Sequence, residues 1–327
     1  MANALIDAVK AGIGVQAAAF ALAAVGLNLQ FGYSGLLNFG HVAFMLAGAY
    51  GTAIVVDQGG SLWLGILAGI AAAVGLGLVF GLPTLRLRAD YLAIVTITAG
   101  ETLRLVVRSG GQGSLTHGVY GIQRFADEFV SVDPFSPGRY GAGRLAWSAL
   151  DLWVIIVGWA LVLICTLLVR GLVTSPWGRV VRAIREDEDA ARSLGKNAFV
   201  YKLQSLCLGG VVGALAGALL AIDQQSVTPD YYLPVLTFYV FTVVILGGPA
   251  TIRGPIVGAI IFWFLLQFTA GALAAGIDDG VIPGWLLQTN EVAAVRFMLV
   301  GLGLMALAIW RPQGIFGRRE EVLIDAR

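Results

Sequence analysis

The chain has 327 residues, of which 58% are hydrophobic and only 13% are charged, and its formal net charge is +1. Soluble proteins are about 25% charged, so this composition, with a mean hydropathy of +0.83, excludes an ordinary soluble domain. The near-zero net charge gives no indication of a nucleic-acid partner. We therefore expect an all-α polytopic membrane protein that forms one transmembrane domain over residues 1–327.

Apolar stretches of the length needed to cross a bilayer, about 20 residues, recur along the whole chain. We expect a bundle of about eight or nine transmembrane helices with at least one broken or re-entrant segment. Two stretches are doubtful as full crossings, because 36–56 is rich in glycine and polar residues and 233–248 is short. The expected spans are 11–30, 36–56, 61–84, 91–107, 151–170, 202–222, 233–248, 254–275 and 294–310.

The stretch GYSGLLNFGHVAFMLAGAY, residues 32–50, is unusual for a membrane segment because it combines four glycines with Ser34, Asn38 and His41. Irregular backbone at membrane depth is tolerated where it is buried in protein or lines a wet cavity. The spacing places the three polar residues on one face of a helix. They are candidates to line a translocation pathway. The alternative is that Asn38 and His41 only hydrogen-bond to a neighbouring helix.

Two charges lie inside the stretch 91–107, at Glu101 and Arg104. A lone charge at mid-membrane costs about 3 kcal/mol on insertion scales. Three residues apart, the two side chains can pair on one helix face and reduce that cost. We interpret them as a structural ion pair near the outer surface. The alternative is a gate or an entry site for a zwitterion.

Lys and Arg are concentrated in a few connecting segments, which predicts the orientation of the chain because basic loops stay in the cytoplasm. Seven basic residues lie in 170–202. Arg86, Arg88 and the C-terminal arginines at 311, 318, 319 and 327 mark two further basic segments. We expect 85–90, 170–202 and the tail 311–327 inside, and 108–150, 223–233 and 276–293 outside.

The segment SPWGRVVRAIREDEDAARSLGKN, residues 175–197, predicts a short amphipathic cytoplasmic helix over about 178–196. Pro176 can begin it and Gly195 can end it. Glu188 and Arg192 are four residues apart in the favourable order, and Arg185 can reach Asp189. The expected apolar face holds Val180, Ile184, Ala191 and Leu194. Such a helix can be a plain connection, can lie on lipid, or can dock a cytoplasmic partner.

Glycines repeat every four residues at Gly209, Gly213 and Gly217. The same spacing occurs at 65 and 69 and at 77 and 81. A stripe of this kind lets a second helix backbone come close, so we expect ordinary helix packing in a dense bundle. The sequence LGGPATIRGP, residues 246–255, predicts a tight turn at the inner face.

The sequence contains no recognisable catalytic apparatus. There is no GxxxxGK[ST] phosphate loop, and the two histidines and two cysteines, at 41, 117, 165 and 207, do not form a metal-ligand cluster. We therefore expect a non-enzymatic chain with no metal and no cofactor of its own. An ion-coupled secondary carrier remains an alternative, with Glu101 as the candidate coupling acid.

Several motifs together resemble the permease subunits of branched-chain amino acid ABC importers, closest to the LivM-like half. They are GLNLQFGYSGLLNFGHVAFMLAGAY (26–50), RLRADYLAIVTITAGETLRLV (86–106), LTHGVYGI (115–122), the run from Ser175 to Leu219, VVILGGPATIRGPIVGA (243–259) and RPQGIFG (311–317). In LTHGVYGI the chain departs from many relatives, which have Gly-rich residues at 117 and 120.

The resemblance implies a pore subunit in a bacterial inner membrane that moves a branched-chain or similar apolar amino acid. It implies a second, homologous permease, an extracytoplasmic substrate-binding protein and two cytoplasmic ATPases that hold ATP and Mg²⁺. It also implies that the 178–196 segment couples to the ATPases. The residues expected to do so are Arg179, Arg182, Arg185, Glu186, Glu188, Arg192, Leu194 and Gly195. Permeases for urea and short amides share these motifs and remain an alternative.

Overall fold

The computed structural model describes residues 2–85, 89–111, 113–278, 292–311 and 313–317. In chain order the helices are α1 (Ala2–Ile13), α2 (Val15–Asn28), η1 (Leu29–Tyr33), α3 (His41–Asp57), α4 (Leu62–Thr84), α5 (Ala89–Arg108), η2 (Gly118–Tyr120), α6 (Asp127–Ser131), α7 (Ala149–Thr174), α8 (Pro176–Glu186), α9 (Glu188–Ser193), α10 (Ala198–Gln224), η3 (Pro229–Tyr231), α11 (Pro234–Gly247), α12 (Gly254–Asp278) and α13 (Val292–Trp310). The expected basic turn at 86–88, most of the outer segment 276–293 and the tail beyond 317 lie outside the described residues.

The helical pattern confirms an all-α polytopic membrane protein. Among the described residues, five helical segments are long and apolar enough to cross a membrane, and α3, α11 and most of α13 are shorter apolar helices. With the charged helix α5, these elements account for all nine expected stretches. The first stretch departs from the prediction, because Gly14 separates α1 from α2 with an extended backbone.

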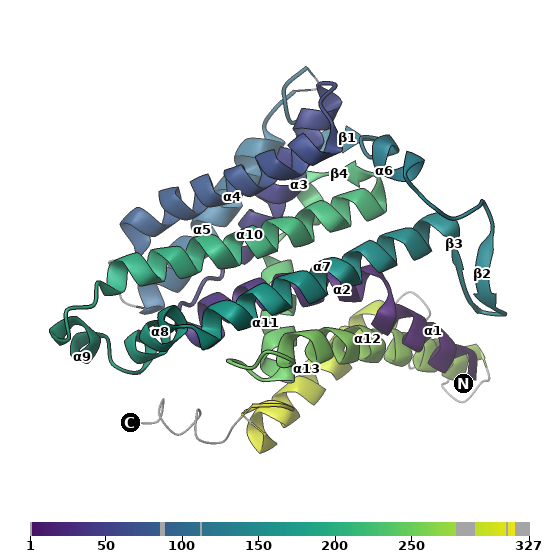
Figure 1. Cartoon of the computed structure of the whole chain (residues 1–327). Coiled ribbons are helices and arrows are strands. Elements are labelled where there is room, and N and C mark those ends of the chain that lie inside the picture. Colours follow the sequence, from purple (N-terminus) through teal and green to yellow (C-terminus); the bar gives the residue numbers. More distant parts are fainter. Residues whose placement is uncertain (1, 86–88, 112, 279–291, 312, 318–327) are drawn as a thin grey trace.

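Helix α2 lies at the centre of the bundle and packs against α7, α10, α11 and α12. The window that contains α2 and η1 is 89% buried, compared with 22–33% for α4, α7 and α12. Its sequence, VQAAAFALAAVGLN, is rich in alanine, and small side chains let several helices approach one backbone at once. The core of the protein therefore forms around the first crossing (Figure 1).

The glycine stripe of α10 forms close helix contacts, as the spacing predicted. Gly209 lies against Gly26 of α2, Gly213 lies against the imidazole of His41, and Gly217 lies against the backbone of Met45. Gly65 and Gly69 of α4 make equivalent contacts with α3 around Thr52 and Gly48, and Gly77 and Gly81 contact α10 at Cys207 and Leu203. The stripes hold α2, α3, α4 and α10 together.

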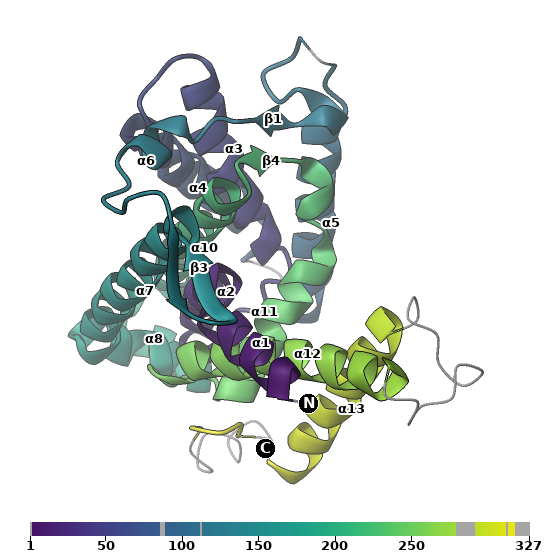
Figure 2. The ribbon, with the colours of Figure 1, turned by 90° about the vertical axis from the view of Figure 1, so that its right-hand side faces the viewer.

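Short strands stabilise the loops at one end of the bundle. β1 (Ile122–Gln123) pairs antiparallel with β4 (Ser226–Val227), and β2 (Arg139–Ala142) pairs antiparallel with β3 (Leu145–Ser148). The figures place these strands at the end of the molecule opposite to α8 and α9 (Figures 1 and 2). The segments 108–150 and 223–233, predicted to lie outside, and the basic segment 170–202, predicted to lie inside, therefore occupy opposite ends (Figure 1).

The predicted cytoplasmic helix over 178–196 is two helices. Asp187 has an extended backbone between α8 and α9, and its carboxylate accepts a hydrogen bond from the Ala190 amide at 2.9 Å. The predicted ends are confirmed, because Pro176 opens α8 and Gly195, at φ +77°, follows the end of α9. The single-helix prediction was wrong because an N-cap aspartate begins a new helix where the acidic run begins.

Replacing Gly217 by alanine is expected to destabilise the protein. A Cβ there would lie 1.9 Å from the carbonyl oxygen of Met45, so α10 and α3 would have to separate. At Gly75 no described atom lies within 4 Å of an added Cβ, and alanine is favoured over glycine in helices by about 1 kcal/mol. The midpoint of thermal unfolding, measured on the purified protein in detergent, should fall in G217A and should not fall in G75A. Equal midpoints for the two variants would contradict the packing.

Candidate functional site

The break between α2 and α3 is the most distinctive feature of the bundle. Helix α2 ends at Asn28, η1 forms one wide π-helical turn, and the chain then runs without helical structure from 34 to 40 before α3 begins at His41. Gly35 has a φ of +69° at the turn. Within the doubtful crossing predicted at 36–56, residues 36–40 are non-helical and His41–Asp57 form one continuous helix, so the irregular backbone lies between α2 and α3. We call residues 29–40 the break.

A buried polar network centred on Gln30 holds the break in place. The Gln30 side chain is fully buried and its amide nitrogen donates to the Leu206 carbonyl of α10 at 2.9 Å. Its Oε1 accepts from Asn38 Nδ2 at 2.9 Å and lies 3.3 Å from His41 Nδ1. One glutamine thus joins both sides of the break to a third helix.

Serine hydroxyls complete the network on the α10 side. Ser34 Oγ donates to the Gln30 carbonyl at 2.6 Å and lies 2.9 Å from Ser205 Oγ. Ser205 in turn donates to the Leu29 carbonyl at 3.0 Å. These bonds satisfy carbonyls that would otherwise lose helical partners, which is required of backbone buried in a membrane protein.

Amide groups at the start of α3 are satisfied by side chains from three elements. The Phe39 amide donates to Thr96 Oγ1 of α5 at 3.1 Å. The Gly40 amide donates to Asn38 Oδ1 at 3.0 Å, and the Val42 amide donates to Thr237 Oγ1 of α11 at 3.0 Å. Since α5 and α11 both hold the start of α3, a shift of the break involves three helices.

The break is also joined to the turn between α11 and α12, residues 248–253. Asn28 Nδ2 donates to the Thr251 carbonyl at 2.8 Å, and Asn28 Oδ1 accepts from the Ala250 amide at 2.9 Å. The amides of Ile315 and Phe316 bond to the last carbonyls of α11. The predicted tight turn at 246–255 is therefore part of the same assembly.

The three polar residues predicted on the break are brought together by the structure. Ser34, Asn38 and His41 have exposed fractions of 2%, 1% and 0%, and their hydrogen bonds go to other residues of this chain. This is the geometry of the neighbour-bonding alternative; a pathway-lining role stays a prediction. Sequence reasoning missed Gln30, although a glutamine inside 46 residues without a formal charge was a visible signal.

Two arginines of α8 contact the break directly. Arg185 Nη1 donates to the Gly32 carbonyl at 2.5 Å, and the aliphatic part of Arg185 lies against Gly35. The Arg182 guanidinium lies 5.7 Å from the centre of the Tyr33 ring and donates to the Val173 carbonyl at 2.8 Å. The predicted pairing of Arg185 with Asp189 is not what the structure shows, because Arg185 points inward to the backbone.

Helix α9 lies outermost and carries the exposed residues. Glu188 pairs with Arg192 at 2.6 Å, as predicted, and also with Lys202 of α10. Of the residues expected on the apolar face, Ile184 and Ala191 are buried, whereas Leu194 is 80% exposed. We call α8 and α9 together the α8–α9 pair. Its exposed residues include Arg179 and Glu186 on α8 and Arg192 on α9, and Leu194 and Gly195, directly after α9, are also exposed.

The predicted Glu101–Arg104 pair is confirmed and is part of a larger cluster. Arg104 is 6% exposed and contacts Glu101 at 2.5 Å and Asp230 of η3 at 2.9 Å. Arg108 adds a second contact to Asp230 at 3.3 Å. The pair therefore joins α5 to the loop between α10 and α11, which the sequence could not predict because Asp230 is distant in the chain.

Aromatic and histidine side chains fix the same end of the bundle. Burial raises the pKa of Tyr232 well above its ordinary value, so its hydroxyl stays protonated and donates to the Gly217 carbonyl at 3.2 Å. His117, at φ +52°, lies 3.6 Å from the carboxylate of Asp57 at the end of α3. This contact connects the loop after α5 to the end of α3.

Replacing Gln30 by leucine is expected to destabilise the break. The variant removes the acceptor that meets Asn38 Nδ2 and His41 Nδ1, at a cost of roughly 1–3 kcal/mol for each buried group left unsatisfied. The same substitution at Gln58, which is exposed at the end of α3, is the control. The midpoint of thermal unfolding in detergent should fall much further in Q30L than in Q58L. Indistinguishable unfolding curves would show that the network contributes nothing to stability.

Comparisons with known proteins identify relatives over most of the chain. The chain is 31% identical to the high-affinity branched-chain amino acid transport system permease protein LivM of Escherichia coli K12, over 89% of this chain and 66% of that protein. It is 24% identical to the probable LivM of Methanocaldococcus jannaschii, over 90% and 89%, and 23% identical to LivH of Escherichia coli K12, over 92% of each.

A solved structure, described as an inward-facing conformation of a putative metal-chelate type ABC transporter, matches with a TM-score of 0.40 and 13% identity over 94% of this chain and 86% of that one.

Residues 11–309 match the family described as branched-chain amino acid transport system / permease component. The chain therefore belongs to the family of branched-chain amino acid transport system permease components.

Proposed function

We propose that this chain is a pore subunit of an ATP-driven importer for branched-chain or similar apolar amino acids. The family match over residues 11–309 supports a membrane transport subunit. The relatives named LivM and LivH are described as branched-chain amino acid permeases, which supports this substrate class over urea or amides. The chain would lie in the inner membrane of a bacterium as a multi-pass protein.

The proposed partners follow from the same family. A second homologous permease would complete the pore, an extracytoplasmic binding protein would deliver the amino acid, and two cytoplasmic ATPases would hold ATP and Mg²⁺. The α8–α9 pair supports ATPase docking because its exposed surface combines both signs of charge with Leu194, which is 80% exposed. Docking that covers this leucine would remove its apolar surface from water, which favours association.

The observation that carries the proposal is the contact between α8 and the break. Arg185 bonds the Gly32 carbonyl at 2.5 Å, and Arg182 lies over Tyr33. A displacement of α8 by a docked ATPase would therefore act on η1 and on the Gln30 network behind it. Since α5 and α11 hold the start of α3 through Thr96 and Thr237, the displacement would reach helices on both sides of the break.

Alternating access would then be a shift between two arrangements of the break and its attached helices. In this proposal Ser34, Asn38 and His41 set the shape of the pathway. Glu101 and Arg104 fix its outer end, where α5 meets the α10–α11 loop. The apolar amino acid would pass between this subunit and its partner permease.

Replacing Arg185 by glutamine should uncouple ATP hydrolysis from uptake. A hydrogen bond made by a charged group contributes roughly 1.5–3 kcal/mol, so uptake by the reconstituted complex should fall about tenfold or more. R170Q, on an exposed side chain at the inner end of α7, is the control. Assembly with the ATPases should be retained, because Arg185 points into the permease; unchanged uptake by R185Q would refute the coupling.

Competition for uptake separates the substrate classes. In vesicles that contain the full importer and its binding protein, excess unlabelled leucine should suppress labelled leucine uptake, whereas excess urea should leave it unchanged. Vesicles that lack the ATPases should show no uptake under an imposed proton or sodium gradient. Gradient-driven uptake by the chain alone would instead support the secondary carrier.

A further inference from the structure

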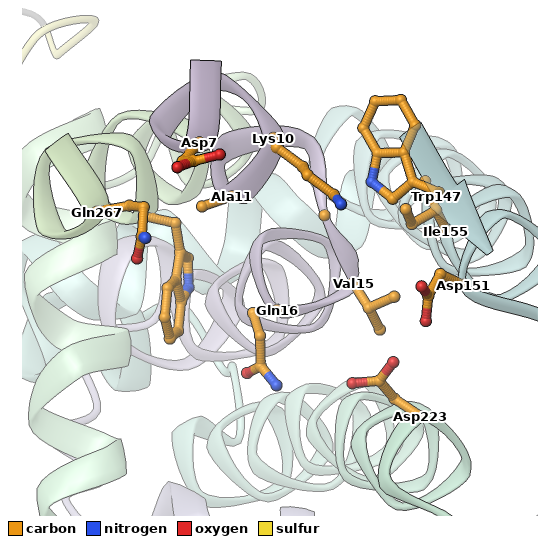
Figure 3. Close-up of a pocket in the computed structure, with 12 residues that line it drawn as sticks. Asp7, Lys10, Ala11, Val15, Gln16, Trp147, Asp151, Ile155, Asp223 and Gln267 are labelled. Carbon is orange, nitrogen blue, oxygen red and sulfur yellow. The ribbon is translucent and has the colours of Figure 1, made fainter. Parts of the chain in front are cut away.

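A cavity of about 460 Å³, lined by apolar and charged side chains, lies away from the break, between the α1–α2 junction, the start of α7, the end of α10 and the middle of α12. Figure 3 shows its lining, with Lys10 on one side and the carboxylates of Asp151 and Asp223 pointing toward one another on the other. It is of the size of ordinary small-ligand sites, which span about 300–1,000 Å³. Neither the break nor the α8–α9 pair contributes to it.

The charges in the cavity are incompletely paired. Asp223 makes no hydrogen bond or ion pair within the described part of the chain, and Asp151 uses its carboxylate only to cap its own helix. Lys10 donates to the Ala146 carbonyl at 2.7 Å and lies 5.6 Å from the Trp147 ring centre. No carboxylate of the described residues lies within ion-pair distance of Lys10. Partly buried charges without partners are costly, so the cavity is suited to a ligand that carries both signs.

Further donor capacity remains among the residues that line the cavity. Two of the three ammonium hydrogens of Lys10 have no partner among the described residues, and the buried indole nitrogen of Trp263 likewise has none. Gln16 and Gln267 add amide groups to the lining. An anionic group near Lys10 and an ammonium between Asp151 and Asp223 would use this capacity.

The surroundings of the cavity indicate that the ligand comes from the bilayer. Trp147 and Trp263 line it, and tryptophan is enriched at the level of lipid headgroups. Apolar side chains next to lining residues in the sequence are exposed, with Val9 and Ile13 at 40% and 39% on α1 and Ile156 at 44% on α7. A molecule with a zwitterionic head and an apolar tail matches both features.

We propose that this cavity binds the headgroup of an ethanolamine phospholipid from the outer leaflet. The phosphate would accept hydrogen bonds from Lys10, and the primary ammonium would donate to Asp223 and Asp151. A choline headgroup is disfavoured, because its quaternary ammonium donates no hydrogen bonds and is best bound by aromatic faces, and Lys10 lies over the Trp147 face. An anionic headgroup without an ammonium leaves Asp223 unpaired.

The test measures lipid retained by the purified full-length chain. Delipidated protein is exchanged into vesicles of equal parts phosphatidylethanolamine, phosphatidylcholine and phosphatidylglycerol, extracted in mild detergent, and its bound lipids are quantified by mass spectrometry. The wild type should retain phosphatidylethanolamine about tenfold over the other two. D223N and K10Q should each abolish the enrichment, and either variant alone decides the result if the other fails to fold.

The controls are D189N and K196Q, which make the same substitutions at exposed positions of the α8–α9 end and should leave the enrichment unchanged. A second experiment measures whether the same protein binds soluble phosphoethanolamine or leucine. Equal retention of all three lipids, or enrichment that survives in either folded variant, D223N or K10Q, overturns the proposal. Binding of a soluble zwitterion that depends on Asp223, without retained phosphatidylethanolamine, also overturns it and assigns the cavity to a free solute.

Discussion

Backbone that is buried in a membrane protein must keep its hydrogen-bonding partners, and the break depends on this requirement. The side chain of Gln30 does most to meet it. A chain that stops being helical at depth frees amides and carbonyls that water cannot reach. Here Gln30 joins α10 to Asn38 and His41, and Thr96 and Thr237 bind amides at the start of α3. The unfavourable conformation is stable because the neighbouring helices α5, α10 and α11 supply the missing partners.

The same arrangement would let the break respond to a movement of α8. A continuous helix satisfies its own backbone and can shift as a rigid rod, whereas the break is defined by bonds to α5, α10 and α11. Arg182 and Arg185 of α8 contact Tyr33 and Gly32 of η1, and so connect α8 to the break. In the proposed coupling, a movement applied to α8 would change this set of hydrogen bonds, and switching transitions of this kind run between discrete packing arrangements.

Local patterns predicted much of this fold, and tertiary pairings account for what they missed. Apolar length predicted the nine stretches, glycine spacing predicted the α10 contacts, and the polar glycine-rich segment at 32–50 predicted the break. The partners of Arg185 and Arg104 lie 153 and 126 residues away, beyond any periodicity. Asp187 looked like one member of an acidic run, yet it caps α9, because its backbone conformation is set by packing.

Hydrogen exchange within the break tests the central claim most directly. In the assembled importer, amide exchange of residues 29–40 and of α8 is measured by mass spectrometry with and without a non-hydrolysable ATP analogue. The account predicts that the nucleotide alters exchange in both segments of the wild type, and that in a double R182Q and R185Q variant only α8 responds. A nucleotide response of α8 with no change at 29–40 in the wild type would contradict it.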